Sequence, residues 1–194
     1  MQKTSPVTTT AVVDRRFAQC MPFVLQQEDV DPTNWSDPKN YSDTPGDPGG
    51  ATFNGIIQSE YNIWRRTHGL PTQSVKILTR AEGYAIYRAN YWLPHCPHLP
   101  VGLDLQFFDS AVNQGSEEAT RILQVALHIT NDGIWGPKTT SAVALIVDVE
   151  DVIEAFTVRR QVAYSESHGF GEFGKGWTRR TAEIGAAAAK MVAA

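Results

Sequence analysis

A 22-residue segment near the N-terminus, residues 29–50, excludes regular helix from a chain that is otherwise patterned for helices. The segment DVDPTNWSDPKNYSDTPGDPGG contains four prolines, three glycines and five aspartates. Proline removes a backbone donor and glycine favours non-helical conformations, so no helical period persists here. Loops of this length without regular structure are usually functional or disordered. We therefore predict a long loop, or a loop with a small β-hairpin.

Apolar residues recur at helical spacing on both sides of this loop. The expected helices cover about residues 12–27, 56–68, 79–92, 103–115, 116–127 and 137–145, with a long helix from about 152. Thr79 and Glu82 have the spacing of a capping box, and Pro137 suits the first turn of a helix. The glycine-rich stretch 169–176 is expected to be loose. The predicted fold class is mainly α, with a long loop or small β-hairpin after the first helix.

Length and charge restrict the class of protein further. The chain has 194 residues and a formal net charge of -4, so a basic nucleic-acid-binding surface is not expected. The sequence contains no run of 18 apolar residues, so no transmembrane helix is predicted. The N-terminal residues lack the apolar core of a secretory signal. We expect synthesis in the cytoplasm without an ordinary export signal, and no membrane insertion.

The two cysteines, Cys20 and Cys96, are too few for a disulfide framework. Two free thiols are expected, and a single disulfide is the alternative. His95, Cys96 and His98 resemble a metal cluster, but zinc requires three or four ligands and no partner pair occurs elsewhere. We predict no metal and no organic cofactor.

A candidate catalytic group lies at the two ends of the loop. Glu28 directly follows the first predicted helix, and the loop closes with DPGGATFNGI, which contains Asp47 and Thr52. A carboxylic acid opposed by a second carboxylate and a hydroxyl fits glycoside hydrolysis, in which one carboxyl protonates the leaving oxygen. The alternative to a catalytic role is purely structural: Glu28 would be a solvated residue at a helix end, and Asp-Pro-Gly-Gly would be a simple turn.

Five ordered segments carry a family resemblance. They are FVLQQEDV…DPGGATFNGI, RANYW at 88–92, LQFFDSAVNQG at 105–115, ILQVALHITNDGIWGPKT at 122–139 and FGKGWTRR at 173–180. In this order they resemble the glycoside hydrolase family 108 lysozymes, also called secretion-activator-like proteins. The resemblance implies a lysozyme-like fold with Glu28, at the rim of a cleft, as the catalytic acid and with Asp47 and Thr52 as its matched partners. The chain departs from the family pattern in having Asp29-Val30 after Glu28 and a longer loop, which makes Asp37 a rival of Asp47.

The same resemblance implies an activity and a division of the chain. The expected reaction is hydrolysis of the β-1,4 bond between N-acetylmuramic acid and N-acetylglucosamine in peptidoglycan. Residues 1–115 would form the lysozyme-like catalytic region, and residues 116–194 a peptidoglycan-binding-like helical region packed on it. A monomer is expected, acting in the periplasm or cell wall. It would arrive there through a holin-dependent membrane hole, like a phage or prophage endolysin, or through a secretion system, like a toxin.

Further residues are candidate contacts to the glycan strand. Amide side chains at a helix end could bind N-acetyl groups or hydroxyls, an acid one turn earlier could share that face, and aromatic rings could stack on sugars. The set is Asn54, Tyr91, Asp109, Asn113, Gln114, Trp35 and Tyr41. Helix capping and core packing are the structural alternatives for its amides and its aromatic rings.

Two other classes of function stay open. A non-catalytic wall-binding module would keep the same residues while Glu28 performs no chemistry. A wall amidase or peptidase would instead use a cysteine with a histidine, or a metal.

Overall fold

The chain folds mainly into α-helices, with a small antiparallel sheet after the first helix, which confirms the predicted fold class. The computed structural model describes residues 7–28, 30–31, 33–43 and 50–194. Two compact units are distinguished, Met21–Asn90 and a helical unit made of Met1–Cys20 with Tyr91–Ala194. The first helix, α1 (Val7–Gln27), contributes residues to both. The division predicted at residue 115 stays a prediction.

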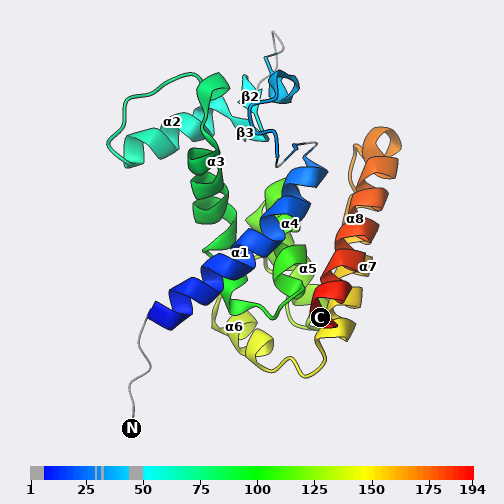
Figure 1. The fold of residues 1–194 in the computed structure, drawn as a ribbon. Helices are drawn as coiled ribbons and strands as arrows, with labels where there is room; N and C mark the ends of the chain where they lie inside the picture. The colour runs from blue at the N-terminus through cyan, green and yellow to red at the C-terminus, as the bar shows by residue number, and fades with distance from the viewer. Residues whose placement is uncertain (1–6, 29, 32, 44–49) are drawn as a thin grey trace. The chain divides into compact units, whose positions relative to one another are not determined.

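The unit Met21–Asn90 is built from short elements (Figure 1). After α1 they are η1 (Pro38–Asn40), β1 (Tyr41–Ser42), β2 (Thr52–Phe53), β3 (Ile56–Ile57), α2 (Gln58–Thr67), η2 (Val75–Ile77) and α3 (Arg80–Tyr87). The short π-helix η3 (Arg88–Trp92) begins in this unit and ends in the helical unit. The capping box predicted at the start of α3 is present in both halves.

The three strands pair in the order β1-β2-β3, and all pairs are antiparallel. Phe53 pairs with Ile56 across a two-residue turn, Asn54–Gly55, whose φ angles are 50° and 75°. Two successive left-handed residues define the tight turn that matches the twist of a β-hairpin. Ile56 and Ile57, which we expected to begin a helix, therefore form a strand, and α2 begins at Gln58.

Trp35 anchors the long loop in the core of this unit. Its side chain is buried, and its indole nitrogen donates to the carbonyl of Leu78 at 2.9 Å. The ring lies so close to Gly83 that a Cβ there would overlap it. Edge-on contacts to Phe53 and Tyr84 complete the packing. An aromatic residue in a polar loop has thus folded back to join the core.

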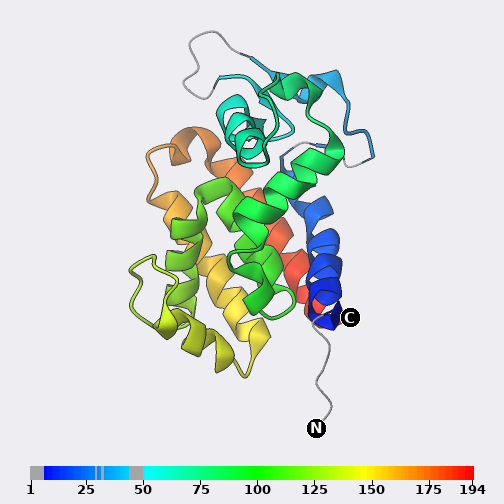
Figure 2. The same cartoon turned by 90° about the vertical axis from the view of Figure 1, so that its left-hand side faces the viewer.

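The helical unit is arranged around α4. Its remaining elements are η4 (Cys96–His98), α4 (Leu103–Gln114), α5 (Ser116–Ala126), α6 (Pro137–Ala144), α7 (Val149–Ser165) and α8 (Phe170–Val192). Every residue of α4 from Leu103 to Ala111 is buried, which makes this helix the centre of the unit. In Figure 1 α7 and α8 run side by side, and Figure 2 shows α5 packed beside α7.

Helix α8 begins at Phe170, so residues 170–176 are helical and the prediction of a loose segment there is wrong. Gly174 lies under the ring of Phe170, where a Cβ would lie 2.9 Å from ring carbons. One turn further on, Trp177 stacks on Tyr164 of α7 with ring centroids 4.9 Å apart. Tertiary packing of these aromatic rings outweighs the low helix propensity of glycine.

Both cysteines are buried, free thiols in the helical unit. Burial raises the pKa of the Cys20 thiol and of the Cys96 thiol, and the carboxylate of Asp104 acts in the same direction. A thiol that stays protonated is a poor nucleophile, so neither side chain suits Cys-dependent chemistry.

Candidate functional site

Glu28 is fixed at the end of α1 by backbone hydrogen bonds. Its N–H donates to the carbonyls of Val24 at 3.2 Å and Leu25 at 3.1 Å. The half-buried side chain lies against the Asn54–Gly55 turn, where a Cβ built on Gly55 would lie 3.5 Å from Glu28 Oε2 and would collide with the Tyr87 hydroxyl. Glycine at position 55 therefore satisfies both the left-handed backbone and the close approach of the acid.

Buried side chains hold this turn in place. Asn54 is fully buried, its amide nitrogen donates to the carbonyl of Trp35 at 2.9 Å, and its amide oxygen accepts from Asn40 at 2.8 Å. The hydroxyl of Tyr87 donates to the Asn54 carbonyl at 3.1 Å. Asn54 thus holds the turn from a fully buried position, and its role as a substrate contact stays a prediction.

Thr52 lies on β2 beside the same turn. It is half-buried, and its hydroxyl donates to the carbonyl of Gly50 at 3.4 Å. Asp47 lies outside the described residues. Its rival Asp37 caps η1, where its carboxylate accepts from the N–H of Lys39 at 3.0 Å.

The aromatic candidates lie in different places. Trp35 and Tyr41 both line a hollow of about 410 Å³ in the unit Met21–Asn90, and Lys76 Nζ lies 4.9 Å from the centre of the Tyr41 ring. Trp35 is also a core residue, so only part of its ring faces this hollow. Tyr91 is half-buried in the helical unit, where its carbonyl accepts from Cys96 Sγ at 3.6 Å.

A buried ion network lies at the centre of the helical unit. The carboxylate of Asp109 accepts from Arg160 Nη1 at 2.6 Å and from Arg180 Nη2 at 2.8 Å. All three side chains are almost completely excluded from solvent. The oxygens of Asp109 are thus buried and hold two arginines, and its role as a substrate contact stays a prediction.

The network fixes the direction of two amide groups. Arg160 donates from Nε to Gln114 Oε1 at 2.9 Å and from Nη2 to the Tyr164 hydroxyl at 3.1 Å. Tyr164 in turn donates to Asn113 Oδ1. Burial raises the pKa of Tyr164 although Arg160 acts in the opposite direction, so the hydroxyl stays a donor. Since arginine can only donate, Asn113 and Gln114 are left with their amide N–H groups for another partner.

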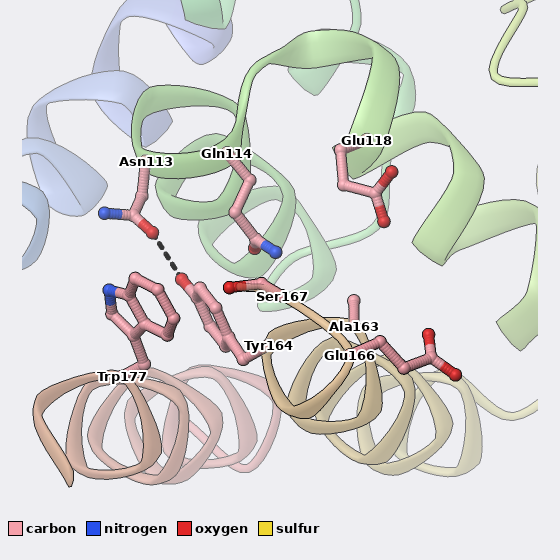
Figure 3. A pocket seen from close by; sticks show the side chains of 8 residues that line it. All are labelled: Asn113, Gln114, Glu118, Ala163, Tyr164, Glu166, Ser167 and Trp177. Atoms are coloured by element: carbon pink, nitrogen blue, oxygen red, sulfur yellow. Dashed lines mark hydrogen bonds between the residues drawn. The ribbon is translucent and has the colours of Figure 1, made fainter. Parts of the chain in front are cut away.

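These amides open onto a pocket of about 450 Å³ (Figure 3). Its lining is Asn113, Gln114, Glu118, Ala163, Tyr164, Glu166, Ser167 and Trp177. Asn113 and Trp177 lie at one end in Figure 3, and the carboxylates of Glu118 and Glu166 lie at the other. The structure thus brings two of the predicted substrate contacts, Asn113 and Gln114, together in one pocket.

Some of the residues that build these sites have signals in the sequence. Asn54–Gly55 between two apolar residues is the strongest short hairpin signal. Arg160 falls in the apolar register of α7 with Ile153 and Phe156, and a charged residue at such a position indicates a buried partner. Tyr87 has no comparable signal.

In the part of the chain that the structure describes, no group of three histidine, cysteine or acidic residues is placed to hold a metal ion. His95 instead stacks on Trp135 with centroids 4.5 Å apart. None of the helices in that part is long and apolar enough to cross a membrane.

Comparisons with known proteins agree with this architecture. The family model of glycosyl hydrolase 108 matches residues 36–115, a range that begins after Glu28. The solved structure of SagA from Brucella abortus has a TM-score of 0.70 and 33% sequence identity, and the match covers 90% of this chain and 94% of that chain. Among curated proteins none matches the sequence.

Fold and family together define a glycosidase with a lysozyme-like helical architecture. The chain belongs to the glycosyl hydrolase 108 family.

Proposed function

We propose that the protein is an N-acetylmuramidase that hydrolyses the β-1,4 bond between N-acetylmuramic acid and N-acetylglucosamine in peptidoglycan. The observation that supports this most directly is the carboxyl group of Glu28, held at the end of α1 against the Asn54–Gly55 turn. An acid on a fixed backbone beside a tight turn has the rigidity that general acid catalysis requires.

In the proposed reaction Glu28 is the proton donor. Its carboxyl proton moves to the glycosidic oxygen as the bond from that oxygen to the anomeric carbon breaks. Water then supplies the hydroxyl that bonds to the anomeric carbon and gives its other proton to a carboxylate of the site, either the second carboxylate or Glu28 itself. Asp47 and Thr52 would position this water or stabilise the positive charge at the anomeric carbon. If the carboxyl groups of Glu28 and Asp47 lie more than ~6.5 Å apart, hydrolysis with inversion is favoured, whereas a separation of ~5 Å favours a covalent intermediate and retention. The anomer of the product, measured by NMR, distinguishes the two mechanisms.

The proposed site of action is the bacterial cell wall. Residues 116–194 would add a peptidoglycan-binding surface to the catalytic region. Release through a holin-dependent hole, as for a phage endolysin, and export by a secretion system, as for a toxin, are both compatible with this activity.

The test is an assay of purified peptidoglycan with three proteins, namely wild type, Glu28→Gln and Glu154→Gln. Glu154 is an exposed residue of α7 in the helical unit, so its variant makes the same chemical change outside the unit that contains Glu28. We expect wild type and Glu154→Gln to release new reducing ends, and Glu28→Gln to be slower by roughly 10²–10⁴-fold because the leaving oxygen loses its proton donor.

Other outcomes would contradict the proposal in different ways. Full activity of Glu28→Gln would remove Glu28 from the mechanism. New free amines without new reducing ends would indicate an amidase or peptidase. Binding of wild type to peptidoglycan with no product would indicate a wall-binding module.

A further inference from the structure

The pocket between α4, α5, α7 and α8 has two chemically different ends. Amide N–H groups and an aromatic pair lie at one end, and two carboxylates lie at the other (Figure 3). All of these groups belong to the helical unit. A ligand that fits must therefore offer hydrogen-bond acceptors to one end and a positive charge to the other.

The amide end requires an acceptor. Gln114 Oε1 accepts from Arg160 Nε and from Ser110 Oγ at 3.1 Å, and Asn113 Oδ1 accepts from Tyr164. Turning the Gln114 amide over would point its N–H groups at the Arg160 donor, and turning the Asn113 amide over would leave the Tyr164 hydroxyl proton without its acceptor. The network therefore leaves the N–H groups of both side chains for another partner, and a peptide or acetamide carbonyl is a matching one.

The acidic end favours a cation. Glu118 is half-buried on α5, and Glu166 is an exposed residue whose carboxylate lies 3.4 Å from Arg159 Nη2. The adjacent Glu117 does not line the pocket and pairs instead with Arg121 at 2.8 Å. Two carboxylates at one end of a pocket repel an anionic ligand and attract an ammonium group.

An apolar wall connects the two ends. The rings of Tyr164 and Trp177 are stacked at an angle of 18°, and Ala163 lies between them and the carboxylates in Figure 3. Such a wall suits a methylene chain that ends in a charged group, because the chain packs on the rings while the charge reaches the carboxylates.

We propose that this pocket binds the peptide stem of peptidoglycan, with a peptide carbonyl on the amides of Asn113 and Gln114 and the primary ammonium of a diamino acid at Glu118 and Glu166. A sugar ring would use the amides but would gain nothing from the carboxylates. This inference rests on the proposed function, because it takes peptidoglycan as the substrate. It goes beyond the proposed function by assigning the pocket to the peptide part of peptidoglycan.

The test is calorimetric titration of the intact wild-type chain with three probes. The probes are a disaccharide tetrapeptide with a free side-chain amine, the same compound with that amine acetylated, and the disaccharide without peptide. We expect the free-amine compound to bind tightest, acetylation to weaken binding roughly two- to fivefold, as for a partly exposed ion pair, and the peptide-free disaccharide to bind more weakly still.

Glu118→Gln and Glu117→Gln form a matched pair of variants, because each removes one negative charge from the same turn of α5. Glu118→Gln should weaken binding of the free-amine compound roughly two- to fivefold and should reduce the difference between the free and acetylated compounds, whereas Glu117→Gln should change neither. Thermal melting of both variants checks that the fold is intact. Higher salt should reduce the preference for the free amine.

Three results would overturn the assignment. They are equal binding of the free and acetylated compounds, equal binding of the peptide-free disaccharide, and equal effects of the two variants. Release of reducing ends from whole peptidoglycan, measured in parallel, tests the proposed hydrolase activity separately. If the protein binds the peptide compound but releases no reducing ends, the assignment of the pocket stands and the proposed hydrolase activity is wrong.

Discussion

The surroundings of Glu28 and the pocket of the helical unit position their polar groups by different physical means. Around Glu28, neutral side chains hydrogen-bond to backbone groups of a tight turn, as Tyr87 does to the carbonyl of Asn54. In the helical unit, Asp109 holds Arg160 and Arg180 in a buried ion network that fixes the amide of Gln114. The first arrangement fixes a backbone, and the second fixes side chains.

This difference has consequences for stability. A neutral hydrogen bond contributes about 1 kcal/mol, whereas removing one member of a buried ion pair leaves a charge without compensation and costs about 3–5 kcal/mol. The network should therefore be far less tolerant of substitution than the turn. Mutations in each unit can test whether the comparison holds.

The largest effect is expected for Asp109→Asn. An amide at this position would leave the buried guanidinium groups of Arg160 and Arg180 without their carboxylate, so the free energy of unfolding should fall by about 3–5 kcal/mol. Urea denaturation followed by tryptophan fluorescence measures the change, with Glu154→Gln as an exposed control expected within about 0.5 kcal/mol of wild type. A loss below about 1 kcal/mol would show that the network adds little to stability.

A smaller effect is expected for Glu82→Gln in the unit Met21–Asn90. Glu82 Oε1 lies 2.6 Å from Arg65 Nη1, and its other oxygen accepts from Thr79 and Tyr61. Partial burial raises the pKa of Glu82, but the hydrogen bonds from Thr79 and Tyr61 and the charge of Arg65 outweigh it and hold the pKa below its ordinary value of 4.5. At pH 7 the substitution should cost about 2 kcal/mol.

The pH dependence of this cost has a definite sign. Because the folded state lowers the pKa of Glu82, its stabilisation is complete above pH 4.5 and is lost as the pH falls through the lower folded pKa. The difference in unfolding free energy between wild type and Glu82→Gln should therefore shrink on acidification below pH 4.5. Urea titrations at pH 7, 5 and 3 measure it, and a difference independent of pH would contradict the role assigned to the charge.

Local signals in the sequence predicted much of the fold. The capping box at Thr79, the first-turn proline at 137 and the small hairpin after the first helix all depend on residues a few positions apart. The stretch 169–176 was wrongly predicted because its helix is stabilised by packing of Trp177 against Tyr164, which lies on another helix. Propensity alone contains no information on such contacts.

The candidate sites divide in the same way. Asn113 and Gln114 were identified as amides at a helix end, but their fixed direction depends on Arg160, which lies 46 positions from Gln114 in the sequence. Asp109 is predicted as a substrate contact from its place one helical turn before Asn113, whereas its partners Arg160 and Arg180 are 51 and 71 positions away in the sequence. No pattern within one helix reveals a pairing over that distance.

The smallest effect is expected from a comparison of two buried tryptophans, one in each unit. Trp35 Nε1 donates to the carbonyl of Leu78, whereas Trp92 Nε1 is buried without a hydrogen-bond partner among the residues described. Both rings pack against other aromatic rings, so replacement by phenylalanine removes a similar apolar area from each. Trp35→Phe additionally loses a hydrogen bond, but Trp92→Phe removes an N–H group that already bears a desolvation cost.

Trp35→Phe should therefore lower the free energy of unfolding by about 1 kcal/mol more than Trp92→Phe, although Trp92 is the more deeply buried of the two. Urea denaturation of the two variants, followed by circular dichroism because each has lost a fluorophore, measures the difference. An equal or larger loss for Trp92→Phe would mean that apolar packing in the helical unit outweighs the unmade hydrogen bond. Polar groups in that unit would then matter for stability mainly where they carry charge, as at Asp109.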